Sequence, residues 1–147
     1  MKILVDADAL PSMVRDVLYR AAERVKMKLI MVANQIFRVP ASEYIFSQAS
    51  TSGPDAADHL IVEFSQPGDL IITADIPLAN RVVEKGATAL NPRGEIYTKS
   101  NIGQKLAVRD FMESLRNSEI QTDGPAPFKE RDRRKFAQSL DSILSKI

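Results

Sequence analysis

The most informative stretch of the sequence is Asp69-Leu70-Ile71-Ile72-Thr73-Ala74-Asp75, an apolar run that is closed at its carboxyl end by an acid. A run of this kind after Pro67-Gly68 predicts a buried β-strand. A second run, Ile3-Leu4-Val5, is followed in the same way by Asp6 and, two residues later, by Asp8. An ionised carboxylate directly after a buried strand is costly unless a partner stabilises it. Both stretches therefore indicate an acidic site at the end of a sheet.

Working outward from these two stretches, strands alternate with helical segments along the whole chain. Apolar and β-branched runs predict five strands, at Lys2–Asp6, Leu29–Ala33, Tyr44–Ser47, Asp69–Thr73 and Ala87–Leu90. Helical spacing of apolar residues predicts helices from Pro11 to Lys26, Asp55 to Phe64, Pro77 to Gly86, Asn101 to Arg116, and over a last segment that includes Phe136 and Leu144.

This alternation is typical of βαβ units, so the predicted fold class is α/β, a three-layer sandwich around a central, mostly parallel five-stranded sheet of Rossmann-like type. The 147 residues are expected to form one domain, with the last helix following a Gly/Pro linker near residues 123–127.

Composition restricts the chemistry and the compartment. The chain has no cysteine, which excludes disulfides and thiolate metal sites, and it has a single histidine. No run approaches the ~20 apolar residues of a membrane span, and the apolar run at the N-terminus is too short for a signal peptide. We therefore expect a soluble cytoplasmic protein without a membrane partner, whose oligomeric state the sequence does not predict.

Charge is distributed unevenly between the two halves of the chain. Residues 1–75 contain seven Lys or Arg and ten Asp or Glu, whereas residues 76–147 contain thirteen and nine. The first half is therefore acidic by three charges and the second basic by four. This asymmetry suits an acidic metal site flanked by a phosphate-binding surface, although ordinary surface charge would produce it as well.

Five aspartates are expected to meet at one edge of the sheet. Asp6, Asp8 and Asp75 follow strands, while Asp55 and Asp58 begin a helix and share one of its faces because they are three residues apart. The carboxyl ends of parallel strands and the helix N-termini that follow them lie at the same edge, where such sheets bind ligands. Carboxylates and water are the ligands that Mg²⁺ and Mn²⁺ prefer. We therefore predict that all five bind Mg²⁺ or Mn²⁺.

Within this group, Asp6 and Asp75 are the predicted catalytic residues, because a bound divalent ion beside them would assist phosphodiester hydrolysis. The predicted phosphate-binding residues are Thr73, Asn91, Arg93 and Arg109. A structural alternative stays open for each aspartate near a helix start. Asp8 and Asp75 could simply cap the helices that follow, and Asp55 and Asp58 lie in a first turn, where the helix dipole favours acids. The lone His59, beside Asp58, is expected to be a surface or partly packed residue, with a catalytic role as the alternative.

Four segments carry a resemblance that covers nearly the whole chain. They are Val5-Asp6-Ala7-Asp8-Ala9, Gly53-Pro54-Asp55-Ala56-Ala57-Asp58, Ile72-Thr73-Ala74-Asp75-Ile76-Pro77-Leu78-Ala79 and Asn91-Pro92-Arg93-Gly94. The later segments Leu106-Ala107-Val108-Arg109-Asp110 and Gly124-Pro125-Ala126-Pro127-Phe128 match as well. In these segments the chain resembles the YaiI/YqxD family of uncharacterised bacterial proteins, which itself looks like a distant relative of PIN-like nucleases. That resemblance implies a parallel sheet, an acidic Mg²⁺ or Mn²⁺ site that includes Asp6, Asp58 and Asp75, and a nucleic-acid substrate, with RNA expected.

Two other functions remain open. Asp6-Ala7-Asp8 after a strand is also similar to the start of haloacid-dehalogenase-like phosphatases, in which the first aspartate is a nucleophile and the second a general acid. Alternatively, the protein is a binding module for phosphate or nucleic acid that lacks catalysis. The main hypothesis is a metal-dependent nuclease.

Overall fold

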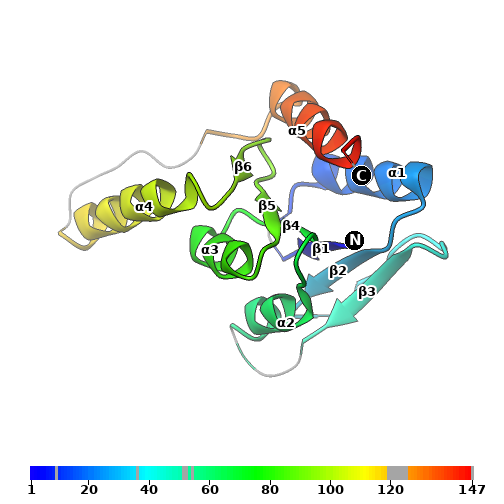
Figure 1. Ribbon diagram of the computed structural model, residues 1–147, viewed down its shortest axis with the longest axis horizontal. Coiled ribbons are helices and arrows are strands. Elements are labelled where there is room, and N and C mark those ends of the chain that lie inside the picture. The colour runs from blue at the N-terminus through cyan, green and yellow to red at the C-terminus, as the bar shows by residue number, and fades with distance from the viewer. Residues whose placement is uncertain (9, 36, 51–52, 54, 119–125, 147) are drawn as a thin grey trace.

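A computed structural model describes residues 1–8, 10–35, 37–50, 53, 55–118 and 126–146 and has the architecture of a three-layer α/β sandwich (Figure 1). The strands are β1 (Ile3–Asp6), β2 (Leu29–Ala33), β3 (Ile45–Ala49), β4 (Leu70–Ile72), β5 (Thr88–Leu90) and β6 (Ile96–Tyr97). The helices are α1 (Ser12–Val25), α2 (Ala56–Phe64), α3 (Ile76–Glu84), α4 (Ile102–Asn117) and α5 (Glu130–Leu144).

All six strands belong to one sheet with the order β3-β2-β1-β4-β5-β6. The first five are parallel, and only β6 runs antiparallel to its neighbour β5. From β1 the chain moves outward to β2 and β3, and then returns to place β4 on the other side of β1. The strand order therefore reverses between β1 and β4, and a crevice for a ligand is expected outside the carboxyl ends of these two strands.

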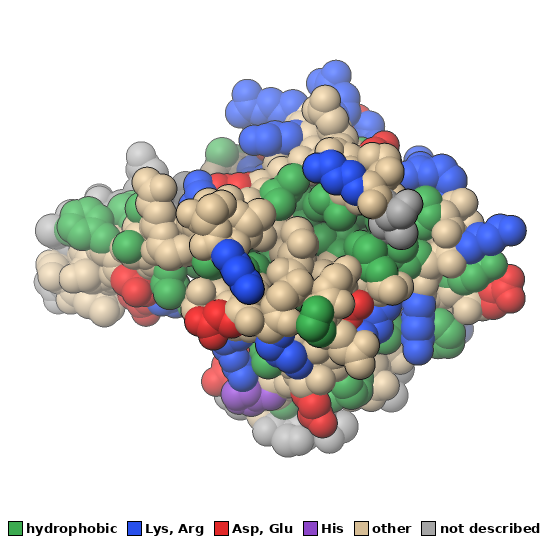
Figure 2. All heavy atoms as spheres, viewed as in Figure 1, with side chains coloured by type: hydrophobic (Ala, Val, Ile, Leu, Met, Phe, Trp, Pro, Cys, Tyr) green, Lys and Arg blue, Asp and Glu red, His purple; other side chains and the backbone are tan. Residues whose placement is uncertain are grey.

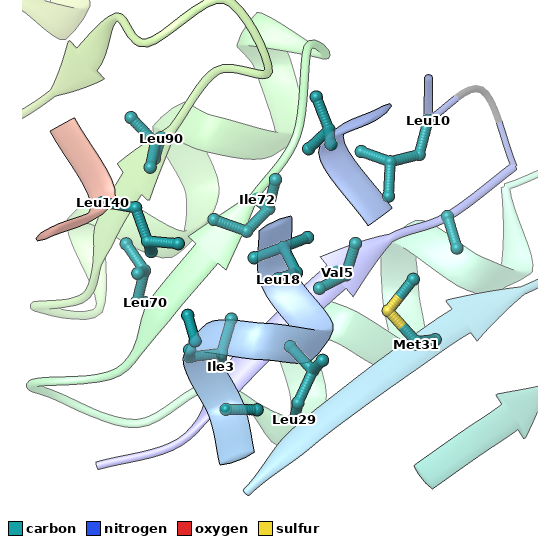
Figure 3. Packing of buried hydrophobic residues seen from close by; sticks show 14 of the residues in the cluster. Ile3, Val5, Leu10, Leu18, Leu29, Met31, Leu70, Ile72, Leu90 and Leu140 are labelled. Atoms are coloured by element: carbon teal, nitrogen blue, oxygen red, sulfur yellow. The ribbon is translucent and has the colours of Figure 1, made fainter. Parts of the chain in front are cut away.

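The sheet is covered on both faces because the side chains of its buried strands alternate between two hydrophobic clusters. Ile3 and Val5 of β1 point into the cluster beneath α1 and α5, which Figure 3 shows from close by, with Leu18 of α1 and Leu140 of α5 packed over the strands. Leu4, between them in sequence, belongs to the cluster on the opposite face, beneath α2 and α3. The central strands are thus fully enclosed, and polar groups that follow them are placed at the edge of a dry core.

The turn between β5 and β6 packs closely against α5. Gly94 has a φ of +91°, and a Cβ atom built there would lie 2.8 Å from the backbone carbonyl oxygen of Lys135. Ser139 also donates a hydrogen bond of 2.6 Å to the carbonyl oxygen of Gly94. Glycine is required at this position for two reasons, the left-handed backbone and the close approach of the helix.

The predicted fold class is confirmed, with differences in detail. The sheet has six strands rather than the predicted five, because the two residues of β6 are too few to give a sequence signal but pair with β5 across the turn at Asn91–Glu95. The predicted third strand, Tyr44–Ser47, lies at Ile45–Ala49. Pro11 is not inside the first helix but at the position before it, with extended backbone.

Two further expectations concern the linker and the membrane. Of the predicted linker near 123–127, residues 123–125 lie outside the described residues, and 126–127 have no regular secondary structure. Among the helices in the described ranges, none combines the length and the apolar character that a bilayer crossing requires.

Candidate metal and phosphate site

The centre of the candidate site is Asp6, the last residue of β1. Its carboxylate Oδ2 accepts a hydrogen bond of 3.0 Å from the hydroxyl of Thr73, which follows β4. The same hydroxyl oxygen accepts a hydrogen bond of 3.0 Å from the backbone N–H of Asp75. Thr73 thus joins the ends of β1 and β4 across the crevice where the strand order reverses. Its side chain contacts both predicted catalytic residues, Asp6 and Asp75, and the phosphate-binding role that the sequence suggested for it stays a prediction.

The pKa of Asp6 is raised from its ordinary value of 3.8 to about 6. The main cause is burial, which disfavours the charged form, and the hydrogen bond from Thr73 opposes it in part. The negative charges of Asp58, Asp75 and Asp8 raise the pKa further, in that order. Three of the other four predicted acids therefore lie near the half-buried carboxyl group of Asp6, and a cation in their midst would relieve both the burial and the repulsion.

Asp58 reaches this group from the first turn of α2. It is half-buried, and its pKa is also raised, first by burial and then by the charges of Asp75 and Asp55. Asp55 precedes α2, is exposed, and makes no capping hydrogen bond with its side chain. The predicted convergence of residues that lie up to 69 positions apart is therefore present in the fold, with Asp55 at its outer margin beside Asp58.

Asp75 and Asp8 both have structural hydrogen bonds. Oδ1 of Asp75 accepts a hydrogen bond of 3.0 Å from the backbone N–H of Leu78. Asp75 therefore caps α3, which is the structural role that the sequence left open for it. Asp8 is exposed and does not cap α1. Its two carboxylate oxygens lie 3.0 and 3.2 Å from the backbone N–H of Asn34, which follows β2. Capping and metal binding are compatible for Asp75, because its other oxygen accepts no hydrogen bond from the described part of the chain.

The donor set suits a partly hydrated ion better than a closed cage. Within the described residues, no three His, Cys, Asp or Glu side chains are placed so that together they could hold a metal ion. Mg²⁺ commonly binds through one or two carboxylates and fills its remaining positions with water and substrate phosphate. Asp6 and Asp75, each with one oxygen engaged by Thr73 or Leu78 and one oxygen left over, match that mode.

Asn91 and Arg93, two further predicted phosphate-binding residues, make their contacts at the β5–β6 turn and α5. The guanidinium of Arg93 forms an ion pair of 3.2 Å with Asp132 of α5, donates to the carbonyl of Ala126 and lies 5.6 Å over the ring of Phe128. Asn91 accepts a bond of 2.6 Å from the backbone N–H of Arg93 and so shapes the turn after β5. These contacts attach the β5–β6 turn to α5, on the face of the sheet opposite to α2 and α3.

Arg109 lies on α4, where its guanidinium contacts two acids of the same helix. The ion pair with Glu113 measures 2.6 Å and that with Asp110 measures 3.1 Å. A phosphate-binding role for Arg93, Asn91 or Arg109 stays a prediction.

Two residues near the acids had no clear signal in the sequence. Arg81 of α3 and His59 of α2 are exposed, and their side-chain nitrogens lie 3.2 Å apart. The guanidinium of Arg81, and after it the nearby His59, lower the pKa of Asp58, in opposition to the burial and the acidic neighbours that raise it. A phosphate bound near the acids would need a positive side chain beside it. Arg81 is such a side chain, but its place near Asp58 follows only from the packing of α3 on α2. The sequence offered one hint, the adjacency of His59 to Asp58.

Comparison with known proteins finds relatives that match over almost the whole length of the chain. A UPF0178 protein of Hahella chejuensis is 56% identical over 146 residues, covering 99% of this chain and 97% of its own, and that of Desulfotalea psychrophila is 48% identical over 147 residues, covering 100% and 99%. Among solved structures, the homospermidine synthase of Legionella pneumophila in complex with NAD matches with a TM-score of 0.49 and 12% identity, over 84% of this chain and 35% of that one. The model of the uncharacterised YaiI/YqxD family matches residues 4–146, and the chain therefore belongs to that family.

Proposed function

We propose that this protein is a metal-dependent nuclease, distantly related to the PIN-like nucleases, that hydrolyses phosphodiester bonds, with RNA as the expected polymer. The observation that carries the proposal is the environment of Asp6, a half-buried carboxyl group at the reversal of strand order whose neighbours are three further aspartates. Structural capping accounts for Asp75, but it does not account for Asp6, which ends a strand and has no helix to cap.

Mg²⁺ or Mn²⁺ is the proposed cofactor, held by Asp6 and Asp75, with Asp58 and Asp8 near enough to add charge. Such an ion supplies a polarised water and neutralises charge on the phosphate. Thr73 is proposed to position Asp6 by means of its hydrogen bond, and Arg81 to attract the phosphate to the acidic edge. Because the protein itself offers few ligands, metal binding should be weak alone and should tighten when a phosphodiester is present.

The test is cleavage of end-labelled RNA and single-stranded DNA by purified protein with Mn²⁺, with Mg²⁺, or with EDTA. We expect cleavage that requires the metal and is lost in Asp6→Asn and in Asp75→Asn, while both variants keep the far-UV circular dichroism of the wild type. Asp16→Asn, an exposed acid on α1, is the matched control and should cleave like the wild type.

Two results would count against the proposal. If the protein cleaves neither polymer with either metal, the proposal of a nuclease is refuted. Equal cleavage by wild type and Asp6→Asn would assign the activity to a contaminant or to another site.

A further inference from the structure

A groove lies between the start of α3 and one face of α4, next to the candidate site. Its volume is about 340 Å³, and its lining includes Ile76 of α3 together with Lys105, Val108, Arg109 and Arg116 of α4. Ile76 follows Asp75 directly in the sequence. The groove is therefore lined at α3 by the residue that follows Asp75, and the rest of its lining belongs to α4.

The charge of the groove is positive. Three of its lining residues are cations and none is an acid. Lys105 forms an ion pair with Glu95, and Arg109 with Glu113, but exposed ion pairs of this kind contribute little and can be exchanged for a phosphate. Arg116 is exposed and forms no ion pair within the described ranges.

Exposed apolar side chains accompany these cations. Of the sixteen residues of α4, only Ile102 is buried, and the helix extends away from the sheet as an arm (Figure 1). Val108 and Phe111 are 55% and 62% exposed. They are three residues apart and so lie on the same side of the helix. Figure 2 shows apolar side chains along this arm.

We propose that this groove and the adjoining surface of α4 bind single-stranded nucleic acid. Cations that contact the phosphates, combined with aromatic and apolar surfaces on which unpaired bases pack, are the means by which proteins bind single strands without regard to sequence. A duplex would keep its bases away from Phe111 and Val108. The choice of polymer rests on the proposed function, because the groove includes Ile76, the residue next to Asp75, but binding itself requires neither metal nor catalysis.

The experiment measures binding of a fluorescently labelled single-stranded RNA of about 12 nucleotides by anisotropy in EDTA, where cleavage is blocked. We expect the double variant R109A/R116A to lower the slope of log affinity against log salt by about 1.4, or about 0.7 for each lost contact. We expect Phe111→Ala to weaken binding about fivefold or more, and duplex RNA to bind less tightly than the single strand. The matched control is R131A/R134A, which removes two exposed arginines from α5, in the layer on the opposite face of the sheet.

The outcomes separate this inference from the proposed function. Binding that depends on α4 without any metal-dependent cleavage would refute the nuclease and leave the inference intact. Cleavage with unchanged binding by both α4 variants would refute the inference alone. The inference also fails if only the α5 variant loses affinity. It fails as well if Phe111→Ala converts a dimer into a monomer by light scattering and leaves RNA binding unchanged, since the apolar surface would then be an interface between two copies of this chain.

Discussion

Replacing Asp6 by asparagine should stabilise the metal-free protein. Burial and three neighbouring acids raise the pKa of Asp6 from 3.8 to about 6. Each pKa unit corresponds to about 1.4 kcal/mol, so keeping this carboxylate charged at neutral pH costs the folded state roughly 3 kcal/mol. The amide oxygen of asparagine can still accept the hydrogen bond from Thr73. After allowance for burial of the amide, we expect a gain of about 1–3 kcal/mol, or a rise in Tm of roughly 2–10 °C for a domain of this size.

The direction of the pH dependence follows from the same shift. Because the folded-state pKa of Asp6 is higher than the unfolded one, the folded state binds more protons between pH 3.8 and about 6. Asp6 therefore lowers the free energy of unfolding of the wild type as pH rises through this window, and the whole penalty is present above it. The raised pKa of Asp58 acts in the same direction. The Asp6→Asn variant should show a smaller loss of stability between pH 5 and pH 7 than the wild type.

The assay is urea unfolding followed by circular dichroism, at pH 5 and at pH 7, with EDTA present. Asp16→Asn, which removes an exposed acid from α1, is the control and should change stability by less than about 0.5 kcal/mol. Added Mg²⁺ should then stabilise the wild type more than Asp6→Asn, because only the wild type keeps both proposed ligands, Asp6 and Asp75. A clear loss of stability in Asp6→Asn at pH 7 would refute the reasoning and identify Asp6 as a structural hydrogen-bond acceptor.

Three other substitutions test the fold and the site. Gly94→Ala should lower the free energy of unfolding by about 2 kcal/mol or more, because an alanine there would strain the left-handed backbone and clash with α5. The control Gly103→Ala lies within α4, where a Cβ meets nothing, and should raise the free energy of unfolding by about 0.5–1 kcal/mol in the same denaturation assay. Equal effects of the two substitutions would contradict the close approach of the turn to α5. Asp69→Ala should lower the free energy of unfolding by about 3 kcal/mol, measured by thermal unfolding, because the Lys2 ammonium lies 2.6 Å from the Asp69 carboxylate and would lose its partner. An unchanged stability would show that this ion pair is dispensable. Thr73→Val should reduce cleavage and destabilise the fold by about 1–2 kcal/mol, because the Thr73 hydroxyl joins Asp6 to the backbone of Asp75. Thr73→Ser, which keeps a hydroxyl, should retain the cleavage and the stability of the wild type. Loss of activity in the serine variant as well would argue against that role. Incubation with a phosphomonoester followed by mass spectrometry should show no phosphate on Asp6, and an aspartyl-phosphate there would favour the phosphatase alternative.

Local patterns were enough to predict the β1 and β4 strands, since each contains three consecutive apolar residues that are fully buried in a parallel sheet. They were not enough to predict β6, because its two residues are too few to show the alternation of a strand, and the strand exists only through its pairing with β5 across the turn. The roles of Thr73 and Arg93 could not be derived from the sequence either. Thr73 has a polar group at a strand end, as a phosphate ligand would, but whether it faces solvent or a neighbouring carboxylate depends on which strand lies beside it.

The amino-acid sequence alone established an α/β protein with acids after its buried strands, because strand periodicity and the position of a charge relative to an apolar run are local properties. Tertiary packing settled which acids meet. The reversal of strand order between β1 and β4 places Asp6 against Thr73 and Asp75, and the packing of α2 and α3 adds Asp58 and Arg81. Segments that are distant in sequence must pack together before a charge is buried, carboxylates repel one another, or a groove forms along α4. These properties depend on distances in space, which a linear pattern does not contain.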